Sequence, residues 1–101
     1  GLWEFPGGRI NSGENGPICI TRKAKEKLNI LINPRNFIKK INHSYSHFTI
    51  TLDAYKCTYK KGPPKALGCE DFRWIYPSQL NQFSFHGAIH KLFDTIEGDV
   101  T

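Results

Sequence analysis

Eight residues in the middle of the chain alternate strictly between apolar and more polar side chains. The apolar positions are Phe48, Ile50, Leu52 and Ala54, and the positions between them hold Thr49, Thr51, Asp53 and Tyr55. A period of two places one face of a strand against a core and leaves the other face toward solvent. The pattern therefore predicts a strand over 48–55. Because only short connections flank it, we expect this strand to pair antiparallel with a neighbour.

Two segments have helical spacing instead. From Pro17 to Leu28 no glycine or proline interrupts a stripe formed by Ile20, Ala24 and Leu28. Pro17 suits the first position of a helix and Asn29 suits its end. Near the C-terminus, the spacing i, i+3, i+4, i+7 predicts a second amphipathic helix, with the apolar residues Ile89, Leu92, Phe93 and Ile96.

The remaining segments complete a mixed pattern. Residues 2–5 and 71–76 resemble short strands, the stretch 36–41 is compatible with extended chain, and Asn33-Pro34 is expected to end the apolar stretch 30–32. Pro77-Ser78 suits the start of a short turn. The order strand, helix, strands, helix predicts one α/β domain over 1–101, with helices packed on a sheet. The aromatic residues expected in its core are Trp3, Phe5, Phe48, Trp74 and Phe93.

Charge and cysteine content limit the classes of function. The 101 residues carry 14 Lys and Arg against 9 Asp and Glu, a formal net charge of +5, and the excess lies before residue 66. This suggests a polyanionic partner only weakly, and on charge alone a solvated surface is the better explanation. No long uncharged apolar run is present, so we expect no membrane partner. Three cysteines without a C-x-x-C pair indicate reduced thiols and a cytoplasmic location, at the nucleoid if the source is bacterial.

The first ten residues, Gly1-Leu2-Trp3-Glu4-Phe5-Pro6-Gly7-Gly8-Arg9-Ile10, resemble the opening of a Nudix domain. In that family a Gly-Gly turn leads into a glycine–glutamate–helix signature, the Nudix box. The spacing continues here, because five residues separate Gly8 from Glu14 and seven separate Glu14 from Arg22. The resemblance implies an α/β, or α+β, fold with a mixed sheet packed between helices. The strand that the family places before Trp3 is missing, so the chain is expected to be a fragment of a longer one.

The chemistry of the box departs from the family. Three glutamates of the box helix bind Mg²⁺ or Mn²⁺ in the hydrolysing members, and here these positions hold Lys23, Glu26 and Lys27. Hard divalent cations require clustered oxygen ligands, and two ammonium groups repel them. We therefore expect a degenerate box with no metal site and no catalytic residue. Its lysines could still face a phosphate directly.

A second resemblance covers nearly the whole chain. His43-Ser44-Tyr45-Ser46-His47, Trp74-Ile75-Tyr76-Pro77 and Phe83-Ser84-Phe85-His86 are similar to segments of the C-terminal domain of MutY-type adenine DNA glycosylases. Tyr45 stands where that family usually has Phe, and His86 where it has Pro. The resemblance implies a DNA-repair recognition domain for 8-oxoguanine opposite adenine in double-stranded DNA. Its partner would be its own N-terminal glycosylase domain.

This second resemblance also implies roles for three residues and for cofactors. Tyr45 would stack beside the oxidised base, Ser46 would bond its altered edge, and His47 would support the loop or approach a phosphate. The domain itself would hold no cofactor, because the iron–sulfur cluster of the family belongs to the glycosylase domain. Structural roles for Tyr45 and His47 are the alternative.

Two other functions stay open. One is a diverged Nudix pyrophosphohydrolase acting on an oxidised nucleotide such as 8-oxo-dGTP; it would need Mg²⁺, with Glu14 and Glu26 as the only carboxylates of the box and Glu70 and Asp71 outside it. The other is a binding module whose basic face docks a partner without lesion specificity. His86 and His90 have the spacing of metal ligands, but no third ligand is evident.

Overall fold

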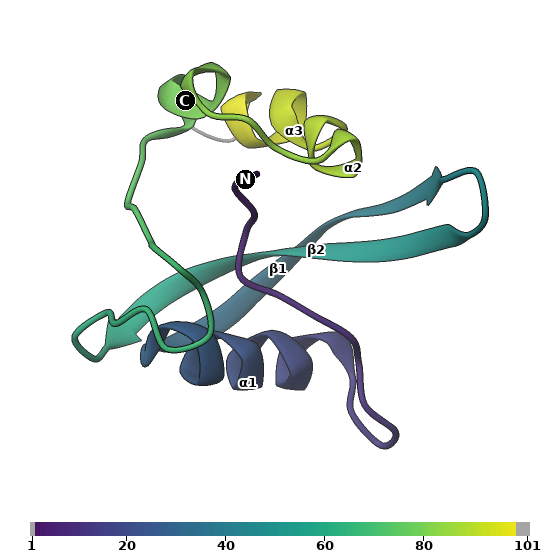
Figure 1. Cartoon of the computed structure of the whole chain (residues 1–101). Coiled ribbons are helices and arrows are strands. Elements are labelled where there is room, and N and C mark those ends of the chain that lie inside the picture. Colours follow the sequence, from purple (N-terminus) through teal and green to yellow (C-terminus); the bar gives the residue numbers. More distant parts are fainter. Residues whose placement is uncertain (1, 99–101) are drawn as a thin grey trace. The chain divides into compact units, whose positions relative to one another are not determined.

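The computed structural model describes residues 2–98 (Figure 1). Its elements in chain order are α1 (Gly16–Leu28), β1 (Leu31–Ser44), β2 (Thr49–Lys61), the 3-10 helix η1 (Pro77–Gln82), α2 (Gly87–His90) and α3 (Phe93–Gly98). The predicted mixed α/β class is therefore confirmed. Within residues 2–98, every helix falls short of the length and apolar character that a bilayer crossing demands.

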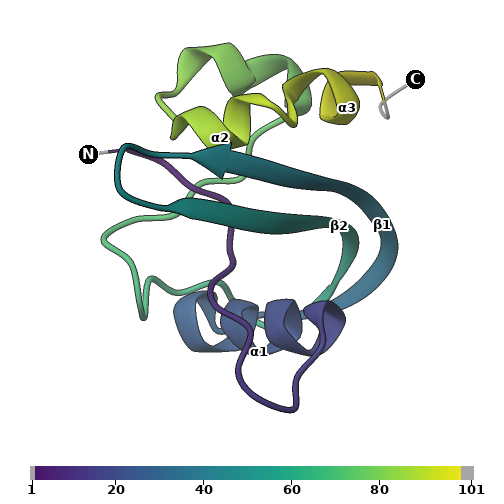
Figure 2. The same cartoon turned by 90° about the vertical axis from the view of Figure 1, so that its right-hand side faces the viewer.

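Strands β1 and β2 form a two-stranded sheet, and Figure 2 shows them running side by side into one hairpin. Cross-strand side-chain bonds fix the register: Lys40 Nζ to Asp53 Oδ1 at 3.0 Å, Thr51 Oγ1 to Asn42 Oδ1 at 2.8 Å, and Ser44 Oγ to Thr49 Oγ1 at 3.2 Å. Each step of two along β1 is matched by a step of two backwards along β2, which is the antiparallel register. The predicted antiparallel pairing is thus confirmed.

Both strands are longer than predicted. β1 continues through Pro34, which was expected to end it, and β2 continues to Lys61. A proline removes one backbone donor, and an edge strand tolerates this when that position points away from the partner. The alternation in exposure is interrupted at residues 52–55, which are all half-buried, and resumes with exposed Lys56, half-buried Cys57 and exposed Thr58; the last residues, 58–61, are all exposed.

The described chain divides into two compact units that share the hairpin. Unit 1 comprises the residues up to Glu4, Ile38–Ala54 and the residues from Trp74 on; unit 2 comprises Phe5–Phe37 and Tyr55–Arg73. The buried apolar side chains of unit 1 are Ile41, Leu80, Phe85, Ala88, Ile89, Leu92 and Phe93. Those of unit 2 are Cys19, Ala24 and Ile30. The apolar core is therefore concentrated in unit 1.

In unit 1, the C-terminal segment supplies most of this core. Phe85 and Phe93 pack edge to face with ring centroids 5.6 Å apart, and Trp3 donates its backbone N–H to Ser84 at 2.8 Å. Trp3 also forms an isolated parallel bridge with Phe85, the only trace of the strand predicted over 2–5. The single helix predicted from Ile89 to Ile96 is interrupted by a turn and present as two short helices, α2 and α3; three of its four apolar positions, Ile89, Leu92 and Phe93, are buried, and Ile96 is half-buried.

Two sequence predictions about strands and core are wrong. Residues 71–76 form no strand, and Trp74 is 65% exposed. Phe48, expected in the core, is 59% exposed at the hairpin turn. Alternating aromatic residues stabilise a strand only when a neighbouring strand supplies backbone partners. Trp3 and Phe5 are half-buried, and only Phe93 of the five predicted core aromatics is fully buried.

Candidate functional site

The helix of the predicted box, α1, has a well-defined start and end. The Asn15 side chain caps it by accepting the backbone N–H of Ile18 at 2.9 Å, and Pro17 lies in its first turn. Asn29 ends it in the left-handed conformation, with φ 58°, and donates its backbone N–H to Lys25. Side-chain oxygens at the start and an αL residue at the end are the usual boundary signals of a helix. The predicted helix is confirmed at both ends.

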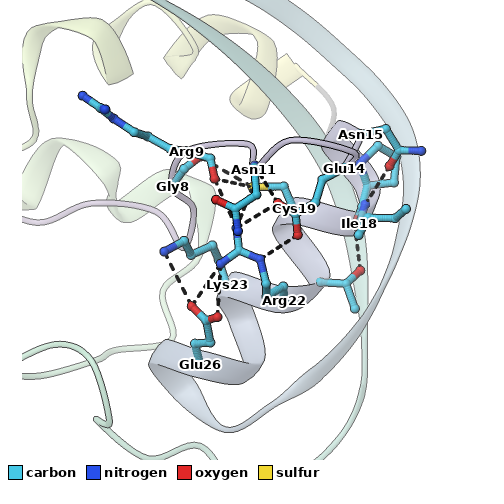
Figure 3. A network of polar contacts seen from close by, with 12 residues as sticks. Gly8, Arg9, Asn11, Glu14, Asn15, Ile18, Cys19, Arg22, Lys23 and Glu26 are labelled. Carbon is cyan, nitrogen blue, oxygen red and sulfur yellow. Dashed lines mark hydrogen bonds and ion pairs between the residues drawn. The ribbon is translucent and has the colours of Figure 1, made fainter.

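Arg22 is the centre of the box in this chain (Figure 3). Its Nε and Nη2 bind both carboxylate oxygens of Glu14, at 2.6 and 2.9 Å. Its Nη1 binds both oxygens of Glu26, at 3.1 and 3.2 Å, and Nη2 also donates to the Arg9 carbonyl at 3.1 Å. One guanidinium therefore holds both box carboxylates and the backbone of the preceding loop. We call Glu14, Arg22, Lys23 and Glu26 the Arg22 network.

The network keeps its carboxylates ionised. The bidentate bond from Arg22 lowers the pKa of Glu14 from 4.5 to about 2, and the backbone N–H of Asn11, 2.8 Å from Glu14 Oε1, lowers it further. The bond from Arg22 also lowers the pKa of Glu26. Hydrogen bonds to the charged form of a carboxyl group stabilise that form. Both acids are therefore held as anions by neighbouring cations.

Lys23 completes the network on the side of the Gly-Gly turn. Its Nζ lies 3.5 Å from Glu26 Oε2, and its side chain passes over Gly8, where a side chain on residue 8 would overlap it. The buried thiol of Cys19 lies 3.3 Å from the Arg9 carbonyl and 3.6 Å from that of Gly8. The helix thus holds the turn through Lys23, Cys19 and Arg22.

Lys27 lies one turn further along the helix. Its backbone carbonyl accepts the N–H groups of Leu67 at 2.9 Å and of Gly68 at 3.1 Å, so the loop after β2 covers the end of α1. Lys25 and Lys27 occupy the last turn, where positive charge is favourable to the helix dipole. The third box position is therefore held in place by backbone contacts.

The box residues do not fit a divalent cation. Mg²⁺ is held by clustered carboxylates whose charge is not compensated, whereas Glu14 and Glu26 are ion-paired with Arg22 or Lys23. Among the described residues no group of three or more His, Cys, Asp or Glu could hold a metal. This includes His86 and His90. Lysines, Lys23 and Lys27, occupy the two remaining glutamate positions.

The three predicted lesion-recognition residues lie together in the turn between β1 and β2. Tyr45 donates its backbone N–H to Phe48 at 2.7 Å, and its ring lies 4.8 Å from the rings of His43 and Phe48. Tyr45, Ser46 and His47 are all exposed. Tyr45 is thus part of an aromatic cluster at the turn, and the roles suggested for these residues stay predictions.

Sequence reasoning missed several groups that build the site. The Arg9 carbonyl, the Asn11 N–H and the Cys19 thiol all position the box without belonging to its pattern. The spacing Asn15-x-x-Ile18 after a turn-rich segment was a usable capping signal. The backbone and thiol contacts leave no trace in a one-dimensional pattern, because they depend on how the turn folds back on the helix.

Comparison with known proteins adds independent information. The chain is similar to an 8-oxo-dGTP diphosphatase of Buchnera aphidicola subsp. Acyrthosiphon pisum, with 26% identity over 95% of this chain and 77% of that protein. It is 30% identical to the 8-oxo-dGTP diphosphatase of the Schizaphis graminum subspecies over 83% of this chain and 63% of that one. Its fold matches the E. coli ORF135 protein, with a TM-score of 0.81 and 23% identity over 97% and 70% of the two chains. It also matches the MutT protein of Methanosarcina mazei, with a TM-score of 0.83 and 17% identity over 98% and 73%.

These findings correct the main functional prediction from sequence. The recognition domain of an adenine glycosylase is contradicted, because the relatives are named as 8-oxo-dGTP diphosphatases and MutT proteins. The Trp3-to-Gly8 opening and the box spacing also occur in hydrolysing Nudix proteins, so they do not discriminate between the branches of the family. The short segment around Tyr45 does not by itself establish the glycosylase branch. The NUDIX domain family matches residues 1–95. The chain therefore belongs to the NUDIX domain family.

Proposed function

We propose that this chain recognises oxidised purine nucleoside triphosphates of the 8-oxo-dGTP class, with its box helix directed to the polyphosphate. The similarity to 8-oxo-dGTP diphosphatases over 95% of the chain carries the substrate class. Arg22 binds Glu14 and the Arg9 carbonyl and so holds the loop before α1 against the helix. This order supports the proposal that the phosphates bind beside the helix. The cationic side chains of the helix suit a polyanion.

Hydrolysis is expected to be much weaker than in metal-dependent relatives. A bound divalent cation ordinarily activates water and neutralises charge on a diphosphate. In the box of this chain the charges of Glu14 and Glu26 are compensated by Arg22, and lysines stand at the other two glutamate positions, so the local charge opposes such a cation. Its own residues can orient and neutralise phosphate oxygens through ammonium groups. Binding is therefore the activity that the site supports best.

The test compares 8-oxo-dGTP with dGTP. Calorimetric titration of the chain should give binding of both nucleotides, with 8-oxo-dGTP on the order of tenfold tighter. Pyrophosphate release should be slow with either nucleotide, with or without Mg²⁺. No binding of either nucleotide would contradict the proposal. Equal affinity for the two nucleotides would show that the chain does not select the oxidised purine. Rapid Mg²⁺-dependent release of pyrophosphate would contradict the account of the box.

A further inference from the structure

We propose that one exposed face of the β1–β2 sheet in unit 2 binds single-stranded nucleic acid, with Arg35 and Lys60 on the phosphates and Phe37 stacked on a base. The residues of this face are Arg35, Phe37, Thr58 and Lys60, which we call the strand platform. All four belong to unit 2, and all four are exposed. They lie outside the Arg22 network, and the ligand is a polymer instead of a nucleotide, so this binding goes beyond the proposed function and does not rest on it.

The four side chains of the strand platform share one face of the sheet. Arg35 and Phe37 are two residues apart on β1, and Thr58 and Lys60 are two residues apart on β2. Side chains two positions apart on a strand point to the same face. Arg35 Nε donates a hydrogen bond to Thr58 Oγ1 at 3.1 Å across the two strands, which places both pairs on one side. A guanidinium, an aromatic ring, a hydroxyl and an ammonium group are therefore presented together to solvent.

The strand portions of unit 2 are basic. In residues 31–37 and 55–61 the charged side chains are Arg35, Lys56, Lys60 and Lys61, and there is no Asp or Glu. Within residues 2–98, neither Arg35 nor Lys60 forms an ion pair. A surface with charge of one sign attracts a partner of the opposite sign, and the phosphate backbone of a nucleic acid is such a partner.

Arg35 is oriented for a phosphate before any ligand binds. Its bond to Thr58 engages only Nε, so the N–H groups of the two terminal nitrogens are left for a ligand within the part of the chain that the structure describes. A planar guanidinium binds two oxygens of one phosphate in a fixed geometry. Because the side chain is already held, less conformational entropy is lost when the phosphate binds.

Phe37 supplies the contact that distinguishes a nucleic acid from other polyanions. Its side chain is 53% exposed. Its ring packs at a steep angle against the ring of Tyr55, with centroids 5.5 Å apart, and Tyr55 is itself half-buried beside Gly16 at the start of α1. A supported and exposed ring can stack on an unpaired base of any type. Bases inside a duplex are stacked on each other, so the expected ligand is single-stranded.

Fluorescence anisotropy tests the charged part of the strand platform. The ligands are labelled single strands of about 12 nucleotides, one DNA and one RNA, and the DNA duplex of the same sequence. Arg35→Gln with Lys60→Gln should weaken single-strand binding on the order of tenfold. It should also reduce the slope of log affinity against log salt by about 1.4, the value for two phosphate contacts. The matched control, Lys25→Gln with Lys65→Gln, removes the same charge from other exposed positions of unit 2 and should change the affinity by about twofold or less.

The aromatic part is tested by Phe37→Leu, which keeps an apolar side chain but removes the ring. This variant should lose about fivefold or more in affinity for the single strands. Its control is Phe48→Leu, since Phe48 is exposed to a similar extent at the hairpin turn. The control should stay within about twofold of the wild type. If circular dichroism shows that Phe37→Leu is unfolded, the arginine–lysine variant decides, because it changes only exposed polar side chains.

The outcomes separate this proposal from the proposed function. Tighter binding of either single strand than of the duplex, lost in the platform variants, supports it, and the stronger ligand identifies the polymer. Absence of single-strand binding, equal affinity for the duplex, or equal losses in platform and control variants would overturn it. Arg35→Gln with Lys60→Gln should leave the affinity for 8-oxo-dGTP unchanged, and an equal loss there would overturn the separation of the two sites. Failure of 8-oxo-dGTP to bind the wild-type chain would contradict the proposed function alone.

Discussion

The two units of the chain are stabilised by different physical means. Unit 1 buries seven apolar side chains, among them Leu80, Phe85 and Phe93, whereas unit 2 buries only Cys19, Ala24 and Ile30. Unit 2 adds the Arg22 network, in which one guanidinium binds two carboxylates. Apolar burial is insensitive to salt and acid, while exposed ion pairs are weakened by both. The stability of unit 2, which carries the box, is therefore expected to depend more on charge than that of unit 1.

Leu80→Ala should have the largest effect on stability. Leu80 is 1% exposed in η1, and removing a fully buried leucine leaves a cavity that costs about 2–5 kcal/mol. The free energy of unfolding, measured by urea denaturation, should fall by that amount. Asn81→Ala, in the same 3-10 helix but exposed, is the control and should change it by about 0.5 kcal/mol or less. Similar losses in the two variants would contradict the assignment of the core to unit 1.

Arg22→Met should destabilise the chain less than Leu80→Ala but should change the titration of the box. Without the guanidinium, the pKa of Glu14 should rise from about 2 toward 4.5, because its largest stabilising contact is lost. Carbon-detected NMR titration of the Glu14 carboxyl measures this shift. Arg22→Lys keeps the charge but not the bidentate geometry, so its shift should be intermediate. An unchanged pKa in Arg22→Met would show that another group holds Glu14.

Acid should loosen unit 2 before unit 1. Because the folded pKa of Glu14 lies below its unfolded value, the network contributes its full stability above about pH 4.5 and loses it as the pH falls toward 2. Glu26, whose pKa is also lowered, acts in the same direction. Hydrogen exchange should therefore show loss of protection in α1 over this range while the amides around Leu92 stay protected. Loss of amide protection at the same pH in both units would contradict the proposed difference in their acid stability.

The local elements of the chain were predictable because their signals are local. Pro17 and Asn29 gave the ends of α1, and the alternation at 48–55 gave β2 and its antiparallel pairing. The interruption expected at Pro34 was wrong, because an edge strand tolerates a missing backbone donor there. The strand expected at 71–76 was wrong because its aromatic alternation has no neighbouring strand to pair with, and Trp74 is exposed instead.

The site was predictable as a set of positions but not as an arrangement. The spacing from Gly8 to Glu14 and Arg22 predicted a common site, and the structure shows Arg22 bound to Glu14. The loss of a metal site through Lys23 and Lys27 stays a prediction. That Arg22 binds both remaining carboxylates depends on how the loop before α1 folds back, which no periodicity encodes. The sequence pattern could not identify the branch of the family, because the opening segment is shared by several branches.

The central claim is that this Nudix box has exchanged a metal site for an anion site, and a titration with Mn²⁺ tests it most directly. Bound Mn²⁺ broadens the amide signals of nearby residues, so the readout is selective broadening at Gly8, Glu14 and Glu26. The account predicts none in the wild-type chain and selective broadening in the variant with Lys23→Glu and Lys27→Glu, which restores the carboxylates. Selective broadening of these signals in the wild-type chain, at Mn²⁺ concentrations about equal to that of the protein, would contradict it.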